Sequence, residues 1–151
     1  MKRFTSSILV FLPLMLAAQI DYSIHLSDGP IHLSNPLKQQ WQAVLKDSSS
    51  QYNSSRYLLV QLQTIPNRTK KLKLKESGIE LLHYIPHYAW VAKLSNQVRL
   101  SDLKTAKVRA ISSLKPDWKM PYSMRQGYIP SHAGTVDKLS VKLLFWKDNT
   151  D

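Results

Sequence analysis

The longest apolar stretch outside the N-terminal leader covers residues 78–94, with the sequence GIELLHYIPHYAWVAKL. The stretch is too short and too polar to be a transmembrane helix. Its Ile, Tyr, Trp and Val residues favour a half-buried pleated strand. Pro86 interrupts both helices and strand ladders, because it lacks a backbone donor and its φ is fixed. The pattern therefore predicts two strands, at about residues 79–84 and 88–94, joined by a short turn.

Further elements are predicted on both sides of this hairpin. The segment RYLLVQLQT at residues 56–64 is apolar on both faces, which is typical of a central strand. Pro66 and Gly78 are start and stop signals for a helix between them. The Lys-Leu-Lys-Leu-Lys alternation within that helix also fits a strand, and we favour the helix. A shorter helix at about residues 97–105 and a strand at 108–114 complete the series.

The order is strand, helix, strand, strand, helix, strand over residues 56–119. This order predicts an α+β, ferredoxin-like βαββαβ domain, with an antiparallel four-stranded sheet and two helices on one face. A domain of this size buries only a modest core. The sheet face away from the helices is expected to be open and to be the place where a partner docks.

Segments of different composition flank this domain. Turn signals at residues 28–30 and 35–36 predict an extended leader. Residues 36–46 form an amphipathic pattern with a proline at its start, which predicts a short helix. A Ser-rich linker follows at 47–55. After a second linker, the apolar sequence KLSVKLLFW at 138–146 predicts an extra C-terminal strand.

The extra strand needs a partner, because a single strand cannot satisfy its own backbone groups. It either adds to the first sheet or begins a truncated second domain, and we favour truncation. The predicted organisation is thus a signal peptide at 1–18, a leader with short helix and linker at 19–55, the ferredoxin-like domain at 56–119, a linker at 120–138 and a further strand or truncated domain at 139–151.

The N-terminus predicts the compartment. A basic start, Met1-Lys2-Arg3, precedes the apolar run ILVFLPLMLAA, and small residues follow for cleavage after Ala18 or Gln19. This is the pattern of a secretory signal peptide, with an uncleaved anchor as the alternative. We expect a secreted or periplasmic protein with no membrane span after cleavage. The chain also has no cysteine, which excludes disulfides, thiolate zinc sites and cysteine nucleophiles.

The chain is strongly basic, with 21 Lys and Arg residues against 10 acids and a net charge of +11. One cluster of cations occurs within the predicted first helix. A solvated helix face explains such a cluster, and a contact for anionic glycan or lipid is the functional alternative. RNA-binding aromatic motifs do not occur on the first or fourth strand, so we expect no nucleic-acid partner. The cluster consists of Arg68, Lys70, Lys71, Lys73 and Lys75.

Catalytic and metal-binding motifs are not evident. The segment His132-Ala133-Gly134-Thr135 loosely resembles the His-Gly-Thr segment of subtilases, but the adjacent glycine is missing and the segment lies in a predicted linker. His83 and His87 have a spacing that suits metal binding on a helix, but a turn is predicted between them. A phosphate-binding glycine loop is also lacking. We therefore expect no enzyme activity, no cofactor and no metal site in this chain.

Three segments together resemble a known family: YLLVQLQTIP, GIELLHYIPHYAWVAKL and VRAISSLKPDWKM. They look like the N-terminal region of secreted bacterial subtilisin-like serine peptidases of family S8, whose pre-catalytic part is similar to the inhibitor I9 propeptide. The resemblance covers residues 56–119, and the catalytic domain is absent. It implies a ferredoxin-like module that assists folding and inhibits the peptidase by docking its sheet on the catalytic domain, in cis or in trans.

The resemblance also implies which residues would dock. The hairpin strands would supply the docking face, and the tail after the fourth strand would lie nearest the peptidase cleft. The chain departs from a simple propeptide because a linker and another strand follow this tail. By position, the implied docking residues are Tyr84, Tyr88, Trp90, Leu114, Pro116 and Trp118.

Three hypotheses follow from the sequence. The first is a propeptide-like folding and inhibition module of an exported subtilase. The second is a free-standing exported binding module that uses its basic helix to contact anionic glycan or lipid. The third, an enzyme in its own right, is disfavoured by the missing catalytic constellation.

Overall fold

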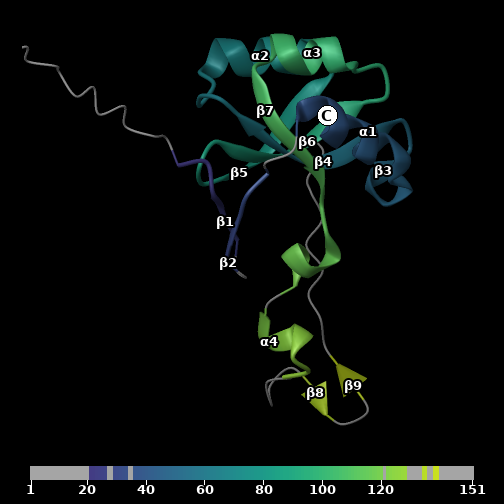
Figure 1. Ribbon diagram of the computed structural model, residues 1–151. Coiled ribbons are helices and arrows are strands. Elements are labelled where there is room, and N and C mark those ends of the chain that lie inside the picture. The colour runs from purple at the N-terminus through teal and green to yellow at the C-terminus, as the bar shows by residue number, and fades with distance from the viewer. Residues whose placement is uncertain are drawn as a thin grey trace, which may run out of the picture.

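The computed structural model describes residues 21–26, 29–33, 36–120, 122–128, 134–135 and 138–139. The chain is an α+β protein with antiparallel sheets (Figure 1). The predicted signal peptide, and all of the predicted C-terminal strand except its first two residues, lie outside the described residues. The strands are β1 (Ile24–Leu26), β2 (Gly29–Ile31), β3 (Gln51–Tyr52), β4 (Ser55–Leu62), β5 (Ile79–Ile85), β6 (Ala89–Ser95), β7 (Val108–Ser113), β8 (Gly134–Thr135) and β9 (Lys138–Leu139). The helices are α1 (Leu37–Lys46), α2 (Arg68–Glu76), α3 (Leu100–Thr105) and α4 (Tyr122–Arg125), with 3₁₀ turns η1 (Ser48–Ser50) and η2 (Pro116–Lys119).

The main sheet is built around β4. This strand pairs with β6 along one edge and with β7 along the other, and β6 also pairs with β5. The order across the sheet is therefore β7-β4-β6-β5, with every pair antiparallel. The short strand β3 adds to the start of β4, so the sheet has five strands and not the four predicted. The Ser-rich segment can turn back there because Asn53 adopts a positive φ of 52°.

The larger core lies between one face of this sheet and the helices. Alternate residues of β4 and β6 point toward it, as expected for pleated strands. Helices α2 and α3 lie side by side over this face, and α1 packs beside β7 (Figure 1). The buried members of this core are Trp41, Val44, Leu58, Val60, Leu62, Leu74, Ile79, Trp90, Ala92, Leu94, Val98, Leu103, Ala106, Val108 and Ile111.

The structure resolves the ambiguity in the lysine-rich segment in favour of the helix. The side chain of Asn67 accepts a hydrogen bond of 2.9 Å from the backbone N–H of Lys70, which caps the start of α2. Gly78 follows the end of α2 with a φ of +83°, a conformation that glycine adopts readily. The start and stop signals thus outweigh the two-residue alternation between them.

The second face of the sheet is covered, and the predictions of an open face and an extended leader are wrong. Strands β1 and β2 form a hairpin that packs on this face. Ile24, Leu59 and Ala89 are fully buried between them. The leader can fold back because Gly29 takes a φ of +111° at the start of β2. The hairpin thus contributes a second, smaller core.

Candidate functional site

The second sheet face is organised around a buried glutamine. Gln61 lies in β4 and is fully buried. Its Nε2 donates hydrogen bonds of 2.8 Å to the carbonyl oxygens of Tyr22 and His87. Its Oε1 accepts a hydrogen bond of 2.7 Å from the guanidinium of Arg109. Since the amide is satisfied on both its oxygen and its nitrogen, its burial carries little penalty, and it ties the leader, the β5–β6 turn and β7 together.

Aromatic contacts reinforce this junction. The Arg109 guanidinium lies 4.3 Å from the centre of the Tyr22 ring, which is cation–π geometry. Tyr22 also contacts Tyr88, with ring centroids 5.8 Å apart, and His25 stacks on His87 at 4.6 Å. His87 and Tyr88 both have positive φ, at 66° and 63°. The turn therefore holds a costly backbone conformation that the leader hairpin packs against.

An exposed carboxylate borders the same junction. Two hydrogen bonds of 2.7–2.8 Å, from the hydroxyl and the backbone N–H of Ser23, hold the pKa of Asp21 below its ordinary value. Electrostatic interaction with His87 and His32 makes a smaller contribution in the same direction to the pKa of Asp21. Asp21 therefore orders the residue that leads into β1, and it places a negative charge near these imidazoles.

The exit from β7 joins this face. Leu114 and Trp118 are half-buried and pack against the second core, together with hairpin residues such as Leu33. The Lys115 ammonium lies 5.4 Å from the centre of the Trp118 ring. Pro116 opens η2 and is exposed. The hairpin and the exit segment thus form one continuous surface, which we call the second-face surface.

The structure divides the six predicted docking residues between two places. Leu114 and Trp118 lie on the second-face surface, Pro116 lies beside them in η2, and Tyr88 borders that surface through its contact with Tyr22. Tyr84 and Trp90 lie elsewhere, on the helix-covered face.

Tyr84 and Trp90 form an aromatic pair beneath α2. The Tyr84 and Trp90 rings are 4.9 Å apart, and Lys71 of α2 lies 4.5 Å from the centre of the Trp90 ring. Trp90 is only 7% exposed, whereas Tyr84 is 40% exposed. The indole Nε1 of Trp90 has no hydrogen-bond partner among the residues that the structure describes. Trp90 therefore acts as a core residue and does not join the other aromatic residues on a docking face.

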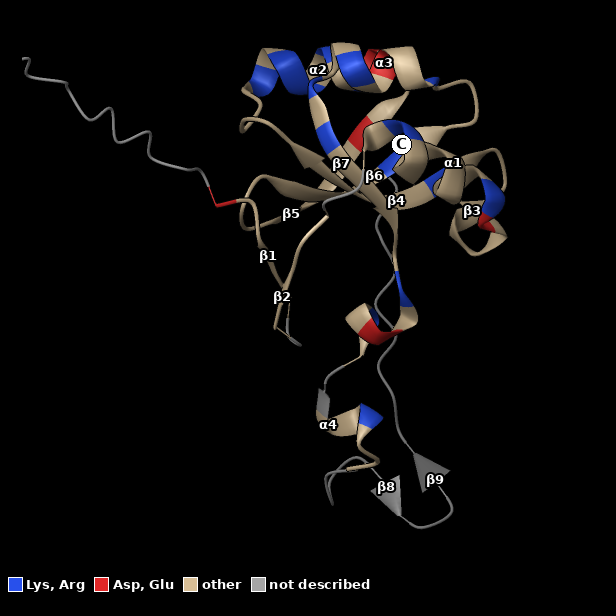
Figure 2. Ribbon diagram, viewed as in Figure 1, with Lys and Arg blue, Asp and Glu red and all other residues tan. Residues whose placement is uncertain are grey.

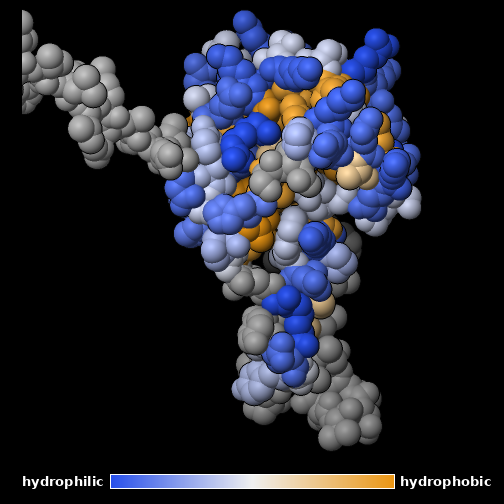
Figure 3. Space-filling view, in the orientation of Figure 1, coloured by the Kyte–Doolittle hydropathy of each residue, from blue (hydrophilic) through white to orange (hydrophobic). Residues whose placement is uncertain are grey.

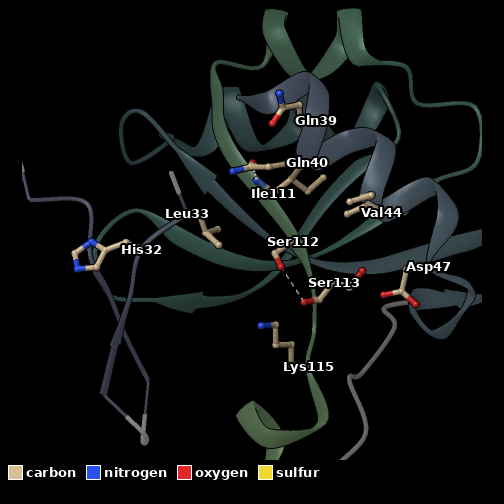
Figure 4. A pocket seen from close by; sticks show the side chains of 11 residues that line it. His32, Leu33, Gln39, Gln40, Val44, Asp47, Ile111, Ser112, Ser113 and Lys115 are labelled. Carbon is tan, nitrogen blue, oxygen red and sulfur yellow. Dashed lines mark hydrogen bonds between the residues drawn. The ribbon is translucent and has the colours of Figure 1, made fainter. Parts of the chain in front are cut away.

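A cavity of about 350 Å³ lies between α1, β7 and the end of the leader hairpin (Figure 4). Residues from all three elements line it, and amide, hydroxyl and carboxylate groups occur there beside the apolar side chains of Leu33, Val44 and Ile111. The Ser113 side chain and Ser49 donate hydrogen bonds that lower the pKa of Asp47 at one end of this cavity. The lining includes Ser112, Ser113, His32 and Asp47, but His32 and Asp47 lie on opposite sides of the cavity (Figure 4). The Ser112 hydroxyl donates to the carbonyl oxygen of Ser113, and neither serine is hydrogen-bonded to His32, so these residues are not arranged as acyl transfer requires.

The five predicted anion-contact residues all lie on α2 (Figure 2). Lys75 forms a salt bridge of 2.6 Å with Glu80, and Lys71 lies over Trp90. Lys70 and Lys73 line a groove of about 330 Å³ between α2 and α3, with Leu74 and Ala106 also in the lining. Arg68 is exposed at the start of the helix. The structure thus brings these cations together on one helix.

Metal-binding clusters and membrane-spanning helices are lacking in the described part of the chain. It contains no group of three or more His, Cys, Asp or Glu residues placed to hold a metal ion. His83 lies in β5, and His87 stacks on His25. Within the same residues, every helix is too short or too polar to cross a bilayer.

Sequence reasoning missed the residues that join the second face, namely Tyr22, Gln61 and Arg109. A signal for Gln61 was present, because it is the one strongly polar side chain within the apolar run LLVQL of β4. A buried polar residue implies partners. Those partners lie 39 and 48 positions away, so the sequence alone does not identify them.

Comparison with known proteins gives one match. The sequence model of a family described as a domain of unknown function (DUF8729) matches residues 19–115. The match covers the leader hairpin, α1 and the main sheet as far as the exit from β7. Among curated proteins and among solved structures, nothing matches.

Proposed function

This chain belongs to the DUF8729 family of unknown function, and on that premise we propose that it is a non-catalytic, propeptide-like module of an exported subtilisin-like serine peptidase. In this proposal it assists folding of the peptidase and inhibits it by docking on its surface. The compartment, the partner and the absence of catalysis are all part of the proposal.

The observation that carries the proposal is the strand order β7-β4-β6-β5, with α2 and α3 connecting the strands over one face. We interpret this strand order, with two helices on one side, as a ferredoxin-like arrangement, and this interpretation is part of the proposal. I9-type propeptides, which the sequence resembles, have that fold. The five-stranded sheet and the leader hairpin are additions to it.

The covered second face changes how docking would work. The bare sheet is not available, because the leader hairpin packs on Leu59 and Ala89. We assign docking to the second-face surface, in which the outer side of the hairpin adjoins the exit segment. Leu114 and Trp118 anchor that segment on the second core. Lys115, Pro116 and Asp117 are exposed there and are available to enter a peptidase cleft as a product-like tail.

The test is inhibition of purified peptidases by the mature chain, residues 19–151. We expect micromolar or tighter inhibition of subtilisin-type peptidases, faster refolding of the denatured peptidase, and no inhibition of a chymotrypsin-type peptidase. The paired substitution Pro116→Ala and Trp118→Ala should weaken inhibition at least tenfold. The matched control is Leu45→Ser, at an exposed position on α1.

Two results would overturn the proposal. The first is neither inhibition nor help with refolding at micromolar concentration across several subtilisin-type peptidases. The second is equal inhibition of both peptidase classes, which indicates a general substrate or contaminant effect. Loss of inhibition in the Leu45→Ser control would remove the assignment of docking to the second-face surface.

A further inference from the structure

The outward side of α2 combines cations with exposed apolar side chains. Leu72 lies on this helix and is 55% exposed, and Ile65, just before the helix, is 59% exposed. Figure 3 shows hydrophobic surface between hydrophilic side chains at the end of the molecule where α2 and α3 lie. We call this the α2 surface; it consists of Ile65, Arg68, Lys70, Lys71, Leu72, Lys73 and Lys75.

Most of the charge on the α2 surface is not neutralised. Glu76 is the only acid within the helix, against five cations. Lys75 is paired with Glu80, and the ammonium of Lys71 lies over an aromatic ring, where it keeps its charge. Arg68, Lys70 and Lys73 form no ion pair with any residue that the structure describes. The surface therefore carries a local positive potential.

The placement of Leu72 distinguishes between anionic partners. Arg68, Leu72 and Lys75 share one side of α2, since they occur at i, i+4 and i+7. A single buried residue, Leu74, holds the helix to the core from the opposite side. An apolar side chain that protrudes between long cationic ones matches the boundary between lipid headgroups and acyl chains, where the cations remain at the headgroups. A polyanionic glycan would contact the cations and gain nothing from the leucine.

We propose that the α2 surface binds anionic lipid bilayers peripherally, with the cations on lipid headgroups and Leu72 and Ile65 inserted at the interface. This goes beyond docking on a peptidase and does not depend on it. The helices cover the face of the sheet opposite the second-face surface. A membrane and a peptidase could therefore be bound at the same time.

The test is co-sedimentation of the mature chain with vesicles. Residues 1–18 are omitted because their apolar run would itself bind lipid. We expect binding to vesicles of equal parts phosphatidylglycerol and phosphatidylcholine, loss of binding as salt increases, and no binding to phosphatidylcholine alone. Each cation near an anionic surface changes affinity roughly fivefold.

Matched variants separate the electrostatic contribution of the cations to vesicle binding from the hydrophobic contribution of Leu72. Lys70→Glu with Lys73→Glu should weaken binding by at least about 25-fold, and Leu72→Ser should weaken it severalfold. Lys71 is left unchanged because it packs over Trp90. The controls are Lys38→Glu with Lys46→Glu, and Leu45→Ser, which alter cations and a 48% exposed leucine on α1. They should leave binding unchanged, and all variants should retain the wild-type melting temperature.

Several outcomes would overturn the proposal. They are no binding to anionic vesicles, equal binding to neutral vesicles, or equal losses in the α1 controls. A further pattern would identify a polyanion, and not lipid, as the ligand of the α2 surface. In this pattern the Lys70→Glu, Lys73→Glu variant loses vesicle binding, Leu72→Ser keeps it, and the wild-type protein is retained on a heparin column. Peptidase inhibition by the same variants provides a separate readout, so failure of membrane binding and failure of the peptidase proposal are distinguishable.

Discussion

The side-chain oxygen of Gln40 accepts a hydrogen bond of 2.7 Å from the backbone N–H of Ile111, 71 positions further along the chain. Among the described strands, β7 pairs along its length only with β4, so this N–H points away from the sheet. A buried amide without a partner is costly. Helix α1 provides the acceptor and so joins the leader to the edge of the sheet.

The substitution Gln40→Leu should destabilise the protein by about 1–3 kcal/mol, because it leaves the Ile111 N–H buried and unpaired. Urea unfolding followed by circular dichroism would measure this. Gln39→Leu, at the exposed neighbouring position, is the control and should change the free energy of unfolding by less than about 0.5 kcal/mol. Equal effects of the two substitutions would show that the hydrogen bond does not matter for stability.

Replacing Gln61 should loosen the leader hairpin. Gln61→Leu removes the bonds to the Tyr22 and His87 carbonyls. It also removes the shorter of the two hydrogen bonds of the Arg109 guanidinium and leaves only the 3.4 Å bond to the carbonyl oxygen of Leu33. We expect a loss of about 3 kcal/mol and faster hydrogen exchange in β1 and β2 than in β4 and β6. Gln63→Leu, just after the strand and exposed, is the control. Unchanged exchange in β1 and β2 would contradict the assigned role of Gln61.

The sequence predicted the elements whose signals are local. Helix α2 follows from Pro66 and Gly78, and β4 from its continuous apolar run. The faces of the hairpin were harder to predict, because a shift in register at Leu82, between Leu81 and His83, changes the alternation along β5. That shift places Tyr84 opposite Trp90 on the helix-covered face. An added residue in a strand is invisible without its partner strand.

The leader hairpin could not be predicted from local sequence signals either, for a different reason. Its short strands bury one residue fully, Ile24, and depend on Gln61 and Arg109 for their attachment. A turn signal at residues 28–30 is compatible with both an extended leader and a hairpin. Only the long-range contact decides between them, so the covered second face could not be derived from the sequence.

Trp90→Ala should cost roughly 3–5 kcal/mol, because the side chain is 7% exposed and packs with the larger core. In a small domain this loss approaches the total stability. Trp90→Phe should cost clearly less, since the Nε1 that it removes has no partner among the described residues. Trp118→Ala, at a half-buried position, is the comparison. A melting temperature of Trp90→Ala equal to that of Trp118→Ala would contradict the burial of Trp90.

Acid should weaken the junction between α1 and β7. Hydrogen bonds from the Ser113 side chain and from Ser49 lower the pKa of Asp47 below its ordinary 3.8. Because the folded pKa is depressed, the contribution of Asp47 to stability is complete above pH 3.8 and is lost as the pH falls through the lower, folded value. Asp47→Asn should flatten the acid limb of a plot of melting temperature against pH. An identical acid limb in the variant would show that Asp47 does not contribute.

Gly78→Ala should destabilise the protein by about 2 kcal/mol or more, because it adds a backbone cost and a steric cost. A comparison with Gly127→Ala separates these two costs. Gly78 has a φ of +83°, which costs an L-residue about 1–2 kcal/mol. A Cβ there would also lie 3.1 Å from the Cβ of Ser95 and 3.2 Å from Cγ2 of Val98, in the tightly packed region between β6 and α3. Gly127 has a similar φ of +76°, but none of the residues that the structure describes has an atom within 4 Å of an added Cβ. Gly127→Ala should therefore show the backbone cost alone, and the difference between the two free energies of unfolding measures the steric contact. If the two substitutions destabilise equally, the packing around Gly78 is looser than the structure shows.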